Sequence, residues 1–244
     1  MLLLNRYQYN PGGDLLGKGL TSRVYKALDQ NTNKHVALKL AKLSEPLNKE
    51  EQDVIKSIDH KNLIHYQDIH IIEKEDAFGE TERIQVLIME LAADGNGKKF
   101  YEENRSPENL QFLLSGVLDA ISYLHQKGIA HKNIKPSNVL ICLTEGQPVV
   151  KLSGIESGFH RLPDFNFSFP IPDDCYYFSP DQLNTTGAIS GNDFSTDVWR
   201  LGVTAFEIIT GEVLFKNGAI DSVEKLRSQI LRKELPEKMN ALNA

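Results

Sequence analysis

The chain has 244 residues, of which 41% are hydrophobic and 25% charged, with a formal net charge of −6; such proportions are typical of a globular protein with a buried core. The acidic balance and the lack of a Lys/Arg block argue against a nucleic-acid surface, and Cys142 and Cys175 match no metal-ligand spacing or disulfide framework. No apolar run approaches the ~20 residues of a membrane span, so we expect no membrane contact and a cytoplasmic protein.

We expect residues 1–92 to consist mainly of strands. Segments 35–40 and 85–89 are short and apolar, and polar turns separate them. The helical spacing of Val54, Ile55 and Ile58 predicts a helix over 47–58. Residues 76–82 have the polarity expected at the tip of a long hairpin.

After residue 92 the pattern becomes helical. Gly95-Asn96-Gly97 indicates a break, and helices are expected over 195–210 and 223–231, with another beginning near 235. This change predicts two lobes around a cleft, a strand-rich lobe over 1–92 that includes the hinge and a helical lobe over 93–244. Helical periodicity also predicts a long helix with a buried stripe formed by Leu110, Phe112, Leu113, Val117, Leu118, Ile121 and Leu124.

Residues 131–138 read His-Lys-Asn-Ile-Lys-Pro-Ser-Asn. This octapeptide resembles the catalytic loop of the eukaryotic-type protein kinases, H-R-D-L-K-P-x-N. The resemblance implies an α+β, bilobal protein-kinase-like fold formed by one domain over 1–244, with catalytic positions at Lys135 and Asn138. Asn138 is also a metal ligand in the family. The position of the catalytic base holds Asn133, whose amide cannot take up a proton.

Other motifs agree with this resemblance. Leu16 to Val24 is similar to the glycine-rich loop of the family, although two glycines alone are more often a plain hairpin turn. Val36-Ala37-Leu38-Lys39 is similar to V-A-I-K, which implies an ion pair between Lys39 and Glu51 on the next helix; each alone would read as a solvated charge. Asp197 opens a segment similar to D-x-W-S-L-G, in which the Asp caps the catalytic loop.

The resemblance also implies a nucleotide pocket, with ATP as the expected ligand. Met89 would be the gatekeeper, and the Glu90 carbonyl and the Ala92 amide would meet the adenine edge. Taken singly, most of the apolar positions are ordinary core residues. The implied nucleotide-binding set is Leu16, Gly17, Lys18, Gly19, Val24, Ala37, Lys39, Met89, Glu90, Ala92 and Leu140.

The metal-binding position departs from the family. Gly154-Ile155-Glu156 stands where D-F-G is expected, so the carboxylate that holds Mg²⁺ is missing. If the backbone stays extended, Glu156 points to the same side as residue 154 and could supply a displaced carboxylate. We expect Mg²⁺ binding to be weakened and Glu156 to be a salt-bridged or solvated side chain.

The size of the expected loss in reaction rate favours a pseudokinase. A positioned base is worth about 10²–10⁴-fold in rate, and metal neutralisation adds several kcal/mol. Losing both leaves at best ~10⁻⁴–10⁻² turnovers per second from the usual ~1–100. We therefore expect a domain that binds nucleotide weakly or not at all and that regulates or scaffolds a protein partner.

Two alternatives remain. The chain could be an atypical active ATP-dependent Ser/Thr protein kinase that recruits Glu156, Asp173 or Asp174 for metal. A small-molecule phosphotransferase of related fold is disfavoured because Lys135-Pro136-Ser137-Asn138 follows the protein-kinase form.

The family usually continues with about two further helices, so we expect the helical lobe to be truncated. We favour the explanation that the sequence is a fragment over the alternative that a partner covers the exposed side of the helical lobe.

Overall fold

The computed structural model describes residues 1–19, 21–42, 46–75, 81–159, 171–184, 194–216, 220 and 222–232. Contacts within the chain divide it into two compact units, Met1–Ala93 and Asp94–Ala244. Across the described ranges, no helix combines the length and the apolar character needed to cross a bilayer.

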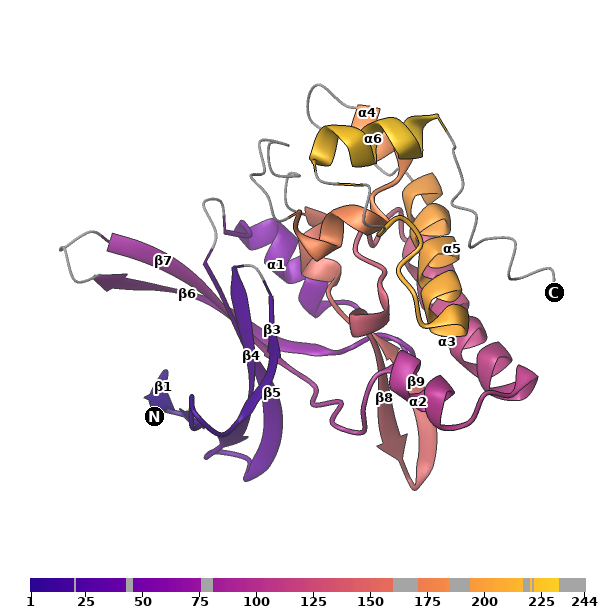
Figure 1. The fold of residues 1–244 in the computed structure, drawn as a ribbon. Helices are drawn as coiled ribbons and strands as arrows, with labels where there is room; N and C mark the ends of the chain where they lie inside the picture. Colours follow the sequence, from indigo (N-terminus) through magenta and orange to yellow (C-terminus); the bar gives the residue numbers. More distant parts are fainter. Residues whose placement is uncertain are drawn as a thin grey trace. The chain divides into compact units, whose positions relative to one another are not determined.

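The N-terminal unit is an antiparallel sheet accompanied by one described helix (Figure 1). The strands pair in the order β1-β2-β4-β5-β7-β6, and β3 pairs with β4. Their bounds are β1 Leu2–Leu3, β2 Tyr7–Gln8, β3 Leu15–Lys18, β4 Ser22–Asp29, β5 Lys34–Lys42, β6 Tyr66–Glu75 and β7 Thr81–Met89, and the helix is α1 Lys49–Lys56.

Strand β5 shows why this sheet has two different faces. Val36 and Leu38 are buried in a hydrophobic cluster that also contains Ile88 of β7. Ala37 and Lys39 alternate with them and therefore point to the opposite face. The core thus covers one face of β5 and leaves Lys39 on the other.

Two predicted features of this unit are confirmed. Strands β6 and β7 form the long hairpin, with pairing that runs from Tyr66↔Met89 to Glu75↔Thr81. The tip was predicted over 76–82, which is wrong for Thr81 and Glu82 because both belong to β7, and residues 76–80 lie outside the described residues. The helix expected over 47–58 forms as α1, which is shorter than expected because Asn48 caps it.

The C-terminal unit is mainly helical and contains one two-stranded antiparallel sheet. The helices expected over 195–210 and 223–231 are present as α5 and α6, whereas residues from 235 onward lie outside the described part. The bounds are α2 Gly97–Glu103, α3 Pro107–Gln126, η1 Pro136–Asn138, β8 Val139–Thr144, β9 Gln147–Leu152, η2 Ile155–Phe159, η3 Asp173–Tyr177, α4 Pro180–Asn184, α5 Phe194–Thr210 and α6 Val223–Leu231, where η marks a 3₁₀ helix.

Helix α3 begins at a strong cap and buries one stripe. The Ser106 hydroxyl accepts a hydrogen bond from the Asn109 N–H at 3.1 Å, and Pro107 follows the cap. The prediction that Leu118 belongs to the stripe is wrong, because its side chain is 51% exposed. Leu118 lies about 100° around the helix from its buried neighbour. The buried residues are Leu113, Gly116, Val117, Ala120, Ile121 and Leu124.

A pair of glycine substitutions tests the packing of α3 on β9. A Cβ on Gly116 would lie 2.6 Å from the Val150 Cβ. We expect Gly116→Ala to lower the free energy of unfolding by about 1–3 kcal/mol through overpacking, even though Ala is the better helix former.

Gly202 in α5 is the matched control. Among the described residues, no heavy atom beyond the helix's own backbone and chain neighbours lies within 4 Å of its added Cβ. Gly202→Ala should therefore raise the free energy of unfolding by about 0.5–1 kcal/mol. Urea unfolding measures both variants, and shifts of the same sign would contradict the close packing at Gly116.

Candidate functional site

A buried carboxylate organises the loop that carries the predicted catalytic residues. Asp197, in the first turn of α5, is 0% exposed. Its carboxylate accepts hydrogen bonds from the backbone N–H groups of His131 at 2.8 Å and Lys132 at 2.7 Å. The His125 Nε2 lies 2.8 Å from Oδ2 of the same carboxylate. The expectation that Asp197 caps the catalytic loop is confirmed.

The loop itself has a constrained backbone. Lys132 has a φ of +59°, in the left-handed region that costs a residue with a Cβ about 1–2 kcal/mol. His131 is fully buried, and its Nδ1 accepts a hydrogen bond from the Asn133 N–H at 3.2 Å. Burial lowers the pKa of His131, which keeps its ring neutral. The loop conformation is therefore held by Asp197 against local preference.

Two asparagine amides meet beside Gly154. The Asn138 Nδ2 donates to the Asn133 carbonyl at 2.7 Å, and the Asn133 Nδ2 donates to the Gly154 carbonyl at 3.4 Å. The Asn138 carbonyl in turn accepts from the Ser153 N–H at 2.9 Å. The fold thus brings the predicted base position, the predicted metal ligand and the start of the D-F-G-like segment together.

The ends of two asparagine side chains lie close to the position where the family places an acid. Gly154 is buried, has a φ of +91°, and a Cβ on it would lie 2.8 Å from the Asn138 Nδ2 and 3.0 Å from the Asn133 Nδ2. A Cβ contact below 3.0 Å requires a shift of the neighbouring group. Amide groups therefore lie beside the position of the missing carboxylate.

The hypothesis that Glu156 replaces the missing carboxylate through an extended backbone is wrong. Residues Ile155–Phe159 form η2, and a 3₁₀ helix turns by about 120° per residue instead of alternating. Glu156 is consequently 3% exposed, in the interior of the C-terminal unit.

The residues around Gly154 do not fit Mg²⁺. This ion prefers oxygen ligands that include one or two carboxylates. The groups nearest to the Gly154 Cβ position are the amide nitrogens of Asn138 and Asn133, which are donors. In the described ranges, no three His, Cys, Asp or Glu side chains gather closely enough to hold a metal ion.

The acidic pair before the buried aromatic residues binds two lysines. The Lys135 Nζ lies 2.5 Å from the Asp174 Oδ1, and the Lys216 Nζ lies 2.9 Å from the Asp173 Oδ1. Both carboxylates that the alternative hypothesis assigned to metal therefore have lysine partners. Sequence reasoning did not find the Lys135 contact, because the two residues are 39 positions apart and no local pattern links them.

Residues after Asp174 anchor it in the core. Tyr176 and Tyr177 are each 6% exposed, and the Tyr177 hydroxyl donates to the Glu207 Oε2 of α5. The Glu207 Oε1 accepts from the Lys98 Nζ of α2 at 3.0 Å. Burial raises the pKa of Tyr177, so this hydroxyl stays protonated and remains a donor.

In the N-terminal unit, pairing aligns several predicted nucleotide-binding residues on one face of the sheet. Gly17 lies opposite Val24, and Val24 lies opposite Lys39. Ala37 lies opposite Met89, and it shares the face of Lys39 because it is two residues away on the same strand. Directly opposed residues of antiparallel strands point to the same side.

The remaining predicted nucleotide residues are outside this row. The Gly19 N–H donates to the Ser22 carbonyl at 2.9 Å, while Leu20 is outside the described residues. The Glu90 N–H donates to the His65 carbonyl at 2.9 Å. Leu16 and Lys18 are exposed on β3, and Ala92 is half-buried. Leu140 belongs to β8 of the C-terminal unit.

The Glu51 side chain caps the start of its own helix. Its carboxylate accepts from the Asn48 N–H at 2.8 Å, and the Asn48 Oδ1 accepts from the Glu51 N–H at 3.0 Å, which completes a capping box. The structure thus shows a local role that helix periodicity did not predict. The ion pair between Lys39 and Glu51 stays a prediction.

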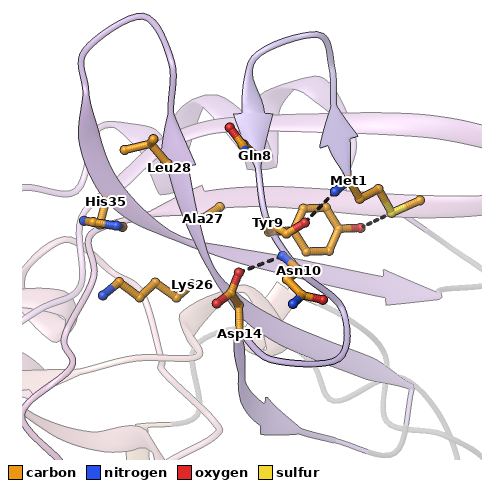
Figure 2. A pocket seen from close by; sticks show the side chains of 9 residues that line it. All are labelled: Met1, Gln8, Tyr9, Asn10, Asp14, Lys26, Ala27, Leu28 and His35. Atoms are coloured by element: carbon orange, nitrogen blue, oxygen red, sulfur yellow. Dashed lines mark hydrogen bonds between the residues drawn. The ribbon is translucent and has the colours of Figure 1, made fainter.

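A cavity of about 370 Å³ lies elsewhere in the N-terminal unit (Figure 2). Within it, the Asn10 N–H donates to the Asp14 carboxylate at 2.7 Å. None of the predicted nucleotide-binding residues is among those that line it, which are Met1, Gln8, Tyr9, Asn10, Asp14, Lys26, Ala27, Leu28 and His35.

Replacing the buried carboxylate should loosen the catalytic loop. Asp197→Asn puts an NH₂ group against backbone N–H donors, so we expect the free energy of unfolding to fall by about 1–3 kcal/mol or more. Asp181→Asn is the control, because the exposed Asp181 carboxylate accepts from the Ser195 hydroxyl at 3.1 Å and should matter by less than about 0.5 kcal/mol. Urea unfolding compares them; equal losses would contradict the role of Asp197.

Comparisons with known proteins identify the family of this chain. A model of the protein kinase domain matches residues 12–242. Cytokinesis protein sepH of Aspergillus terreus (strain NIH 2624 / FGSC A1156) is 32% identical over 215 residues, which cover 84% of this chain and 14% of that protein. Cell division control protein 7 of Schizosaccharomyces pombe is 29% identical over 209 residues (82% and 18%).

Serine/threonine-protein kinase atg1 of Dictyostelium discoideum is 25% identical over 233 residues, which cover 90% of this chain and 32% of that protein. The chain therefore spans no more than about a third of the length of these relatives. The family match and the α+β fold, with a strand-rich N-lobe and a helical C-lobe, agree. The chain belongs to the protein kinase domain family.

Proposed function

We propose that this chain is a pseudokinase domain that does not transfer phosphoryl groups and that regulates or scaffolds a protein partner. The observation that carries the proposal is the backbone of Gly154, whose φ of +91° disfavours any side chain and whose added Cβ would lie 2.8 Å from the Asn138 Nδ2. An acid at this position would have to displace that amide. The local packing therefore favours a site that works without Mg²⁺.

The base position supports the same proposal. The Asn133 Nδ2 donates to the Gly154 carbonyl at 3.4 Å, and a neutral amide cannot accept a proton from a substrate hydroxyl. A general base contributes about 10²–10⁴-fold. Together with the loss of metal neutralisation, this predicts turnover too slow for signalling.

ATP is the nucleotide that we propose for the N-lobe. Val24, Ala37 and Met89 share one face of the sheet with Lys39, which offers apolar surface beside a cation. Such a face can bind a base and phosphates without a metal ion. We propose weak, metal-independent ATP binding, in a domain with a cytoplasmic location and a protein partner.

An active atypical Ser/Thr protein kinase is the alternative. The similarity to atg1 of Dictyostelium discoideum, a serine/threonine-protein kinase, favours it. The contacts of the carboxylates weigh against it: Glu156 is 3% exposed, and Asp173 and Asp174 each pair with a lysine. Catalysis would need one of these groups to move.

A thermal-shift titration with ATP, combined with a transfer assay, tests the proposal. Ligand at about 100 times Kd adds ~2.7 kcal/mol, which raises the Tm of a domain of this size by roughly 5–10 °C. We expect a rise that does not require Mg²⁺ and that Lys39→Met abolishes, with no phosphoryl transfer to protein substrates. Transfer that is lost in Lys39→Met would establish the active alternative.

Restoring the family's acids should fail because Gly154 has a backbone conformation that disfavours a side chain. We expect Asn133→Asp alone to fold normally, whereas adding Gly154→Asp should lower the Tm by several degrees without restoring transfer. The φ of +91° costs a residue with a Cβ about 1–2 kcal/mol, and the contact with Asn138 adds to this. Gly154→Ala, which adds the Cβ without the charge, is the control. A double variant with unchanged Tm and measurable transfer would contradict this explanation.

A further inference from the structure

The sheet of the N-terminal unit has two edges of very different length. In the strand order, β1 stands at one end and β6 at the other. Strand β1 has two residues, whereas β6 has ten. Among the described strands, only β7 pairs with β6, so no described strand covers the outer side of β6. A long open edge of this kind is a template for pairing with a further strand.

The side chains of β6 combine an exposed apolar residue with charges of both signs. Ile71 is 44% exposed, and Asp68 and the exposed Lys74 each lie three residues away from it, on opposite sides. The Asp68 carboxylate is held at the edge, because its Oδ1 accepts from the Ile69 N–H at 2.9 Å and its Oδ2 lies 3.0 Å from the His70 Nε2. The charges therefore stand symmetrically about Ile71.

Geometry restricts how β6 can pair with β6 of a second copy. Two copies related by a two-fold axis bring the same edge together, and their edge strands then run antiparallel. From Asp68 to Glu75 the pairing of β6 with β7 is regular, so side chains along this stretch alternate between the two faces. Residues directly opposite each other share a face. Each allowed register therefore places one residue of β6 on the axis.

Charge selects one of these registers. With Ile71 on the axis, Asp68 of each copy lies opposite Lys74 of the other copy, and such cross-strand pairs are favourable. An axis at Asp68, Glu73 or Lys74 opposes two like charges, and an axis at either neighbour of Ile71 forms no pair of opposite charge. The Ile71 register also pairs nearly the whole of β6 and brings the two exposed isoleucines together.

We propose that β6 is a self-association edge, at which two copies of this chain pair antiparallel with Ile71 on the two-fold axis. Asp68 and Lys74 then form reciprocal ion pairs, and the sheet of one N-terminal unit continues into that of the other. This association goes beyond the proposed function and does not require it, because it uses neither the catalytic loop nor a nucleotide.

Sedimentation velocity of the whole chain measures the association. A single strand pair buries less surface than a standard interface, so we expect a weak dimer with a Kd of about 10–100 µM. Lys74→Asp turns both ion pairs into like-charge pairs and should raise Kd by about tenfold or more. Adding Asp68→Lys exchanges the two charges and should bring Kd back to within about threefold of the parent value.

Two control variants match these changes elsewhere in the chain. Lys99→Asp makes the same change of charge at a side chain of α2 that is 71% exposed, and it should associate like the parent chain. Ile71→Lys places two cations together on the axis and should abolish the dimer, whereas Leu118→Lys, at a residue of α3 that is 51% exposed, should not. Thermal unfolding of each variant checks that it is folded.

A parent chain that stays monomeric up to tenfold above the expected Kd range would overturn the proposal. So would a dimer that neither Lys74→Asp nor Ile71→Lys weakens, because it would have to form through another surface. Equal weakening by Lys74→Asp alone and by the exchanged pair, in folded variants, would contradict the register.

Discussion

The buried carboxylate of Asp197 is the group on which the C-terminal site depends. A fully buried charge is tolerated only when donors surround it, and here the N–H groups of His131 and Lys132 and the His125 ring supply them. In return, the carboxylate holds Lys132 in a left-handed conformation that it would not adopt locally. The positions of the residues that follow, Asn133 to Asn138, are set by this contact because they continue the same short loop into β8.

Next to this contact, Asn133 and Gly154 are neutral residues at positions where the family has carboxylates. The Asn138 amide donates to the Asn133 carbonyl, and the Asn133 amide donates to the Gly154 carbonyl. This set of contacts is satisfied without a cation, whereas two carboxylates at the same spacing would repel each other unless a metal lay between them. With neutral residues at both positions, the loop is held by hydrogen bonds alone.

Local sequence pattern predicted most of the fold. Residues 35–40 were predicted as a strand, but its two faces emerged from the structure, in which Val36 and Leu38 enter the core and strand pairing places Val24 and Met89 beside Ala37 and Lys39. Glu51 shows the limit of this reasoning. Helical periodicity predicted a helix from residue 47, whereas α1 begins at Lys49, and its N-cap Asn48 is what places the Glu51 carboxylate in the capping box. Leu118 was misplaced because an apolar residue need not join the buried stripe.

The sequence by itself determined the family, the identity of the substituted positions and the order of helices and strands, since each depends on residues that are close together in the chain. Only the tertiary structure decided what surrounds those positions. The pairing of Lys135 with Asp174 joins residues 39 positions apart, and the amide groups beside Gly154 come from the catalytic loop. The 3₁₀ turn that buries Glu156 is a further case. Long-range packing selects among conformations that local preference leaves open, which is why these contacts could not be predicted from sequence spacing.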